Sequence, residues 1–211
     1  MRQSKLFFLL LAGIVILSLV FWHTFLREDG GDGTFLVVLD PGHGGSAPGA
    51  VYDGVEEKDI NLQVALRVEE LLEDQENLSV RLTRGEDADL GLYERAQLAN
   101  DAGADLFVSL HSNALEQTDY EGIFTYFWTS KSEQAAQVIQ NAVVEATGGV
   151  DRGIRSEEFV VIRETKMPAV LVEMGFMTCP EELERLIDPD YQDKLAQGLV
   201  DGILALQAQA H

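Results

Sequence analysis

The stretch Leu36-Val-Val-Leu-Asp-Pro-Gly-His43 decides the fold that we predict for this chain. Its short, apolar, β-branched run over 34–39 ends at Asp-Pro-Gly and therefore predicts a buried strand. Two later stretches, Leu106-Phe-Val-Ser-Leu-His111 and Ala169-Val-Leu-Val-Glu173, have the same pattern. In each of the three stretches, one titratable side chain lies at the carboxyl end of the apolar run.

Helix-like and strand-like segments alternate along the rest of the chain. Apolar residues at helical spacing, with glycines as stops, predict helices over 60–72, 92–102, 132–146 and 192–207. Short apolar or aromatic runs predict strands over 34–39, 79–83, 105–110, 122–128, 159–163 and 169–172. We therefore predict an α/β fold, a single domain with a mostly parallel, partly mixed central sheet covered by helices on both faces.

The first 26 residues are predicted to be a separate unit. Arg2 and Lys5 precede an uncharged run of 21 residues over 6–26, and about 20 suffice for a membrane-spanning helix. The alternative is a cleaved signal peptide, but its apolar core would be about 7–15 residues, and this run has no Ala-x-Ala-like cleavage site. The positive N-terminus predicts that the remainder is exported to the outer face of the cytoplasmic membrane or the cell wall.

A polar linker over 27–33, Arg-Glu-Asp-Gly-Gly-Asp-Gly, leads into a predicted domain over 34–211. From residue 34 onward the chain has 33 acidic and 12 basic side chains, so the whole net charge of −21 falls on this domain. Nucleic acid requires a basic face, and the charge therefore excludes nucleic acid as a partner. We interpret the acidic surface as a feature that favours solubility.

Two histidines and one glutamate lie where ligands bind in open α/β sheets, at the carboxyl ends of strands. If the three strands are parallel neighbours, His43, His111 and Glu173 meet in one cleft. The other two histidines are His23, within the first segment, and His211, the last residue. A single strand-end histidine is commonly a packed or hydrogen-bonded residue, but two in matching positions beside a glutamate favour a functional site.

A further carboxylate comes from Glu56-Glu57-Lys58-Asp59, at the start of the helix predicted over 60–72. Acids at a helix start usually complement the helix dipole. A rotation of about 100° per residue places Glu57 in line with the apolar face and Glu56 about 90° away from it, which favours Glu57 as the sheet-facing carboxylate. Two imidazoles and one carboxylate form a recognised catalytic zinc set, and a second carboxylate beside the water would be the general base.

The chain resembles the zinc-dependent N-acetylmuramoyl-L-alanine amidases of bacteria. The matching segments follow the family's order from 34 to about 206: Leu39-Asp-Pro-Gly-His-Gly-Gly45, Glu57-Lys-Asp59 with Asn61-Leu62, Arg95 with Ala99-Asn100, Ser109-Leu-His-Ser-Asn-Ala114 and Val172-Glu-Met-Gly-Phe176. The resemblance implies that His43, Glu57 and His111 bind one zinc ion (Zn2+) and that Glu173 is the catalytic acid and base.

The implied activity is hydrolysis of the amide between N-acetylmuramic acid and L-alanine in peptidoglycan, by a stand-alone, membrane-anchored enzyme. One alternative is a non-catalytic peptidoglycan-binding or regulatory module on the same fold, and another is a hydrolase of a different amide or peptide. The expected partners are peptidoglycan and, through the N-terminal segment, the cytoplasmic membrane; a regulatory protein is not identified. The short stretch over 115–121 predicts a site that no helix plugs.

Overall fold

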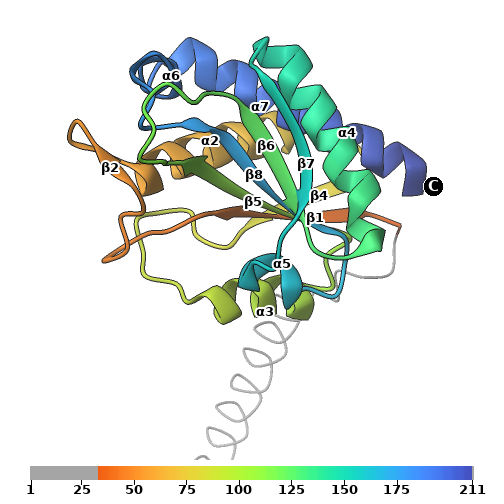
Figure 1. Ribbon diagram of the computed structural model, residues 1–211. Coiled ribbons are helices and arrows are strands. Elements are labelled where there is room, and N and C mark those ends of the chain that lie inside the picture. The colour runs from red at the N-terminus through yellow and green to blue at the C-terminus, as the bar shows by residue number, and fades with distance from the viewer. Residues whose placement is uncertain (1–32, 211) are drawn as a thin grey trace, which may run out of the picture. The chain divides into compact units, whose positions relative to one another are not determined.

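Six strands form the central sheet in the computed structural model, which describes residues 33–210 (Figure 1). They are β1 (Phe35–Pro41), β4 (Leu78–Leu82), β5 (Leu106–Asn113), β6 (Ile123–Phe127), β7 (Asp151–Ser156) and β8 (Ala169–Phe176). Across the sheet their order is β4-β1-β5-β8-β6-β7. The first four in this order are parallel to one another, whereas β6 is antiparallel to β8 and parallel to β7. The predicted mostly parallel, partly mixed sheet is confirmed.

Helices cover both faces of this sheet, as predicted (Figure 1). One face carries α2 (Glu57–Leu72), α4 (Ser130–Thr147), α6 (Pro180–Leu186) and α7 (Pro189–Ala210). The other face carries α3 (Leu92–Ala102) and α5 (Val160–Arg163). A two-stranded hairpin of β2 (Val51–Tyr52) and β3 (Val55–Glu56) leads directly into α2.

Strand β1 lies in the sheet interior and is buried on both sides. Val37 and Leu39 pack into the cluster on the α2 face, while Leu36 and Val38 pack into the cluster on the α3 face. Successive side chains of a strand point to opposite faces, so a continuously apolar strand needs cover on both. Full burial of such a side chain contributes about 1.5–3 kcal/mol, which fixes β1 in its place and register.

The prediction of a strand over 159–163 is wrong, because Val160–Arg163 form the short helix α5. The Phe159 carbonyl accepts hydrogen bonds from the backbone amides of Ile162 and Arg163. A short apolar run does not distinguish a strand from a helical turn. The sequence analysis also missed β7, α6 and the β2–β3 hairpin; β7 reads Asp-Arg-Gly-Ile-Arg-Ser and has no apolar alternation.

The predicted membrane segment over 1–26 lies outside the described residues, as does the linker over 27–33 apart from Gly33. Among the helices within 33–210, none combines the length and the apolar character that a membrane span requires. Residues Thr34–His211 form one compact unit.

Candidate metal centre and active site

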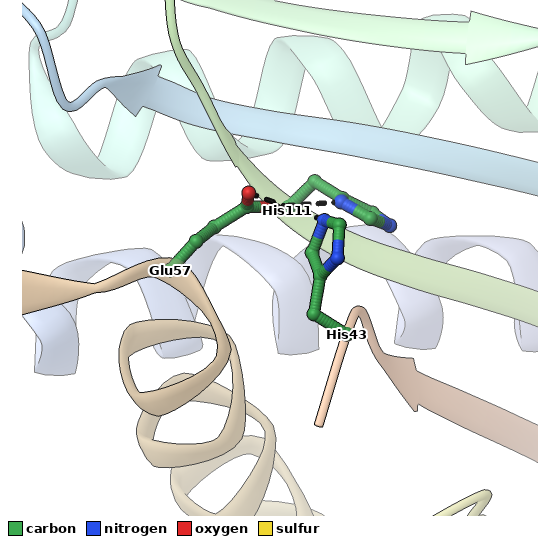
Figure 2. Close-up of side chains that lie close together, drawn as sticks. All are labelled: His43, Glu57 and His111. Atoms are coloured by element: carbon green, nitrogen blue, oxygen red, sulfur yellow. Dashed lines mark hydrogen bonds and ion pairs between the residues drawn. The ribbon is translucent and has the colours of Figure 1, made fainter. Parts of the chain in front are cut away.

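Three side chains from separate elements meet at the carboxyl ends of β1 and β5 (Figure 2). His43 follows β1, His111 lies within β5, and Glu57 is the first residue of α2. Glu57 Oε1 lies 2.8 Å from His111 Nδ1, and Glu57 Oε2 lies 3.1 Å from His43 Nε2. One ligand atom from each residue lies within 4.8 Å of the others, so the group could hold a metal ion. The structure thus brings together the three residues that the sequence proposed as ligands.

The neighbouring acids at the start of α2 have different environments. Glu57 is 5% exposed and faces the two histidines. Glu56 is the N-cap residue of α2, and its carboxylate lies 3.1 Å from the Lys58 ammonium, with the side chain 40% exposed. The helical rotation that favoured Glu57 over Glu56 therefore agrees with the structure, since α2 begins at Glu57.

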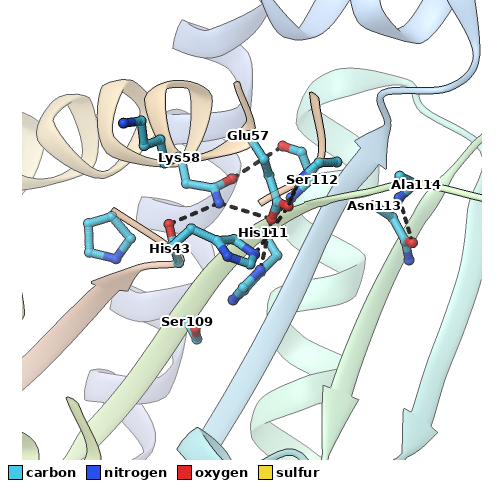
Figure 3. A network of polar contacts seen from close by, with 12 residues as sticks. His43, Glu57, Lys58, Ser109, His111, Ser112, Asn113 and Ala114 are labelled. Atoms are coloured by element: carbon cyan, nitrogen blue, oxygen red, sulfur yellow. Dashed lines mark hydrogen bonds and ion pairs between the residues drawn. The ribbon is translucent and has the colours of Figure 1, made fainter. Parts of the chain in front are cut away.

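Further donors hold the Glu57 carboxylate in place (Figure 3). The backbone amide of Ala50 donates to Oε2 at 2.9 Å, while the backbone amide of Ser112 and the side-chain amide of Asn61 each donate to Oε1 at 3.2 Å. Burial alone would raise the pKa of Glu57, but hydrogen bonds and charges of the two histidines outweigh it and hold that pKa well below its usual range. Glu57 is therefore an ionised, oriented carboxylate, as a metal ligand must be.

Two glycines provide the room for this cluster. A β-carbon at Gly42 would lie 2.3 Å from the His111 ring. One at Gly49, where φ is +73°, would lie 2.4 Å from Glu57 Oε2 and 2.7 Å from the His43 ring. Gly42 and Gly49 therefore have a packing role that a residue with a side chain could not fill without moving the cluster.

A buried arginine fixes the backbone that carries His43. Arg95 from α3 donates to the Asp40 carboxylate at 2.8 Å, to the Pro41 carbonyl at 2.8 Å and to the His43 carbonyl at 2.6 Å. Asp40 also accepts hydrogen bonds from the hydroxyls of Thr83 and Ser109. Arg95 and Asp40 are almost fully buried, and their charges are compensated by this network.

A second arginine, after the neighbouring strand β4, holds the same loop. Arg84 follows β4 and donates to the carbonyls of Pro41, Gly42 and Lys58. His43 has a φ of +62°, which costs a non-glycine residue energy and persists only where the surroundings enforce it. The sequence analysis missed Arg84 and Asp40, although both lie at the ends of predicted strands, where the same rule could have found them.

Glu173 lies beside the cluster on the next strand. It pairs directly with His111 between β5 and β8, so the two side chains share a face of the sheet. Its Oε2 is buried without a hydrogen-bond partner. Burial raises the pKa of Glu173 to about 7, with the charge of His111 lowering it and that of Glu57 raising it. A carboxylate with a pKa near neutrality can both accept and release a proton at the working pH.

A cavity of about 450 Å³ adjoins these groups. Its polar lining includes His43, His111 and Glu173. Apolar side chains near the starts of α3 and α5 and from β8 form another part of the wall: Leu90, Leu92, Phe159, Val160, Val161 and Leu171. Residues 114–122, between β5 and β6, contain no helix, so the prediction that no helix from this stretch plugs the site is confirmed.

The fold and the site define an α/β protein with a potential metal centre and a neighbouring carboxylate suited to proton transfer. Residues 37–205 match the family described as N-acetylmuramoyl-L-alanine amidase. Because this match covers most of the chain, the chain belongs to the N-acetylmuramoyl-L-alanine amidase family. The family that the sequence resemblance predicted is thereby confirmed.

Known relatives match the same part of the chain. N-acetylmuramoyl-L-alanine amidase LytC of Bacillus subtilis is 38% identical over 173 residues, which are 80% of this chain but only 35% of LytC. The germination-specific N-acetylmuramoyl-L-alanine amidase of Bacillus subtilis is 31% identical over 227 residues, covering 97% of this chain and 95% of that protein. The solved catalytic domain of CwlV, an N-acetylmuramoyl-L-alanine amidase from Bacillus (Paenibacillus) polymyxa, is 41% identical, with a TM-score of 0.82, and covers 83% of this chain and 99% of that domain.

Proposed function

We propose that this chain hydrolyses the amide bond between N-acetylmuramic acid and L-alanine in peptidoglycan. Membership of the amidase family supports this reaction. The observation that carries the proposal is the meeting of His43, Glu57 and His111 one strand away from the unpartnered carboxylate of Glu173.

The donor set suits one zinc ion. Two imidazole nitrogens and one carboxylate, with a fourth position left open, are a known catalytic zinc arrangement. His43, Glu57 and His111 would hold the ion, and the neighbouring Gly42 and Gly49 keep side chains out of its space. A zinc ion there would supply Lewis-acid chemistry, lowering the pKa of a water molecule and polarising the amide carbonyl.

Glu173 is the proposed proton carrier. Its carboxylate accepts a proton from the attacking water and then delivers that proton to the amide nitrogen, which leaves as the amine of alanine. A pKa of about 7 suits both transfers. The buried Oε2 has no competing hydrogen-bond donor among the described residues, so it is free to receive the proton.

The N-terminal segment over 1–26 is proposed to hold the domain at the outer face of the cytoplasmic membrane, beside the cell wall. The support is the uncharged run of 21 residues preceded by Arg2 and Lys5. Separating membranes from the released fraction, and measuring the mass of the mature N-terminus, tests this. A chain that begins after residue 26 and leaves the membrane would contradict it.

Removing and restoring metal tests the proposed enzyme. Chelation should abolish the release of peptide from purified peptidoglycan, and added zinc should restore it, while a metal-free protein with full activity would refute the zinc site. The alternative of a non-catalytic binding module predicts peptidoglycan binding without turnover, even when the metal content is one ion per chain. The site is not plugged by the stretch over 114–122, so the isolated chain should cut without an added activator.

A further inference from the structure

Two arginines of β7 lie on the face of the sheet that carries Glu173. The Arg155 guanidinium carbon lies 4.1 Å from the centroid of the Phe124 ring, and that of Arg152 lies 4.3 Å from the centroid of the Tyr120 ring. Phe124 is the direct strand partner of Glu173 between β6 and β8. Arg155 is therefore separated from the proposed proton carrier by one aromatic side chain.

Arg155 differs from several arginines of this domain because no carboxylate of the described residues lies within ion-pair distance of its guanidinium. Arg67, Arg95, Arg163 and Arg185 each lie within ion-pair distance of a carboxylate. The side chain of Arg155 is exposed and has no hydrogen bond or ion pair with any residue between 33 and 210. This is notable in a domain with 33 acidic and 12 basic side chains.

The ring contact orients the guanidinium without consuming its hydrogen-bonding capacity. A cation over an aromatic face is held by the ring quadrupole, which leaves its N–H donors available. The planar fork of an arginine matches a carboxylate in two parallel hydrogen bonds. Arg152 is less available, because its Nε already donates to the Glu121 carbonyl. Arg155 is thus the better placed of the two to bind an anion.

Charged side chains lie on both sides of the site, beside His43 and at β7. Beside His43, the exposed carboxylates of Asp87 and Asp89 accept hydrogen bonds from the backbone amides of Gly45 and Ser46, and Asp87 also forms an ion pair with Lys58. On the β7 side the charges are mixed, because Glu157 directly follows the strand and its charge acts on Tyr126 together with that of Arg155. An anionic group of a bound substrate would be attracted there by the guanidinium of Arg155, which has no carboxylate from the described part of the chain within ion-pair distance.

The distance from Glu173 to Arg155 fits a short peptide. Their strands, β8 and β7, are separated by β6, so two strand spacings of about 4.8 Å lie between them. The Arg155 side chain reaches back over Phe124 on β6, so the gap between its guanidinium and Glu173 is shorter than the two strand spacings. An extended peptide advances about 3.5 Å per residue, so the alanine of the cleaved amide and the residue directly after it together bridge this gap.

Tyr126 lies between Arg155 and the cavity beside Glu173. It is the strand partner of Arg155, and its ring contacts Phe159, which lines the cavity at Glu173. Burial raises the pKa of the Tyr126 hydroxyl, the charges of Glu173 and Glu157 raise it further, and the charge of Arg155 lowers it. The charges of Glu173 and Arg155 therefore both act on this hydroxyl.

We propose that Arg155, braced against Phe124, binds the carboxylate of an acidic residue that directly follows the alanine of the peptidoglycan peptide. Arg155 is then a specificity-determining residue, and this inference rests on the proposed amidase function. It predicts that the enzyme distinguishes peptides with a free carboxylate at this position from peptides in which that group is a neutral amide.

Two synthetic N-acetylmuramoyl pentapeptides test this, differing only in D-isoglutamate or D-isoglutamine after the alanine. The full-length, zinc-loaded chain should cleave the carboxylate form with a kcat/KM about tenfold higher, mainly through a lower KM. Arg155→Gln should lose most of this preference by slowing only the carboxylate form. Arg155→Lys should keep part of it, because the charge remains while the fork is lost.

Lys194→Gln on α7 is the matched control, since it removes the same charge from an exposed position on an element that packs on the opposite face. It should leave the preference unchanged. Equal cleavage of the two peptides by the unmodified chain, or an equal loss on both in Arg155→Gln, would overturn the carboxylate assignment. Cleavage of neither peptide by the unmodified chain would instead refute the proposed amidase function.

Discussion

Replacing Glu173 by glutamine should stabilise the metal-free protein and at the same time remove most of its activity. The carboxylate lies on β8 with its Oε2 buried and unpartnered, so ionising it inside the fold is unfavourable. Glutamine keeps the shape and the hydrogen-bonding capacity of the side chain but has no charge to bury. The substitution therefore separates the effect of this residue on the free energy of unfolding from its effect on the reaction rate.

The pKa of Glu173 gives the size of the effect on stability. Its rise from 4.5 to about 7 corresponds to about 3 kcal/mol, at 1.36 kcal/mol per pKa unit. Because the pKa is raised in the folded state, the protonated fold is favoured, and stability is lost as the pH increases from about 4.5 to about 7. Glu173→Gln should thus be more stable than the unmodified chain by up to about 3 kcal/mol at pH 8, and by less than about 1 kcal/mol at pH 5.

Urea unfolding in the presence of chelator measures this difference at the two pH values. The same variant, loaded with zinc, should bind metal normally but turn over at least about 10²-fold more slowly, which is the lower range for loss of a general base. An unchanged stability at pH 8 would mean that the carboxylate is well solvated or paired, and the argument from its burial would be wrong. Loss of zinc from Glu173→Gln would make Glu173 a ligand instead.

Three further substitutions test how the cluster is built. Glu57→Ala should purify with little zinc while Glu56→Ala keeps it, as measured by metal analysis; equal zinc in both would remove Glu57 from the ligand set. Gly42→Ala should weaken zinc binding by about tenfold or more in a chelator competition, because the new methyl group would lie 2.3 Å from the His111 ring. Arg95→Met should lower the free energy of unfolding by about 3–5 kcal/mol, since it leaves Asp40 charged and buried; a change below about 1 kcal/mol in urea unfolding would show that the network contributes little.

The parts of the fold that could be predicted have a strong local signal. The runs that begin at Leu36, Leu106 and Ala169 are apolar on both faces, and only a sheet covered on two sides can bury them. Once they are parallel neighbours, the positions of His43, His111 and Glu173 at one edge follow from geometry. Glu57 could be predicted from helical rotation because the helix begins at that residue.

The parts that could not be predicted depend on tertiary contacts. Strand β7 is polar and partly exposed, and pairing with β6 rather than its own sequence makes it a strand. The run at 160–163 has strand-like composition, yet it forms a helical turn that buries Val161 and Ile162 against the sheet. The contacts of Arg84 and Arg95 with the His43 loop join residues more than 40 positions apart, a separation at which local patterns carry no information.

The central claim is the identity of the bond that this chain cuts, and mass spectrometry of its products tests it most directly. Purified peptidoglycan is incubated with the zinc-loaded chain, and the newly formed termini are identified, with Glu173→Gln as the matched control. The proposed activity predicts free amino groups on L-alanine and free lactyl carboxyl groups on N-acetylmuramic acid, both absent from the control. New termini at a glycosidic bond or within the peptide, or none at all with zinc bound, would contradict it.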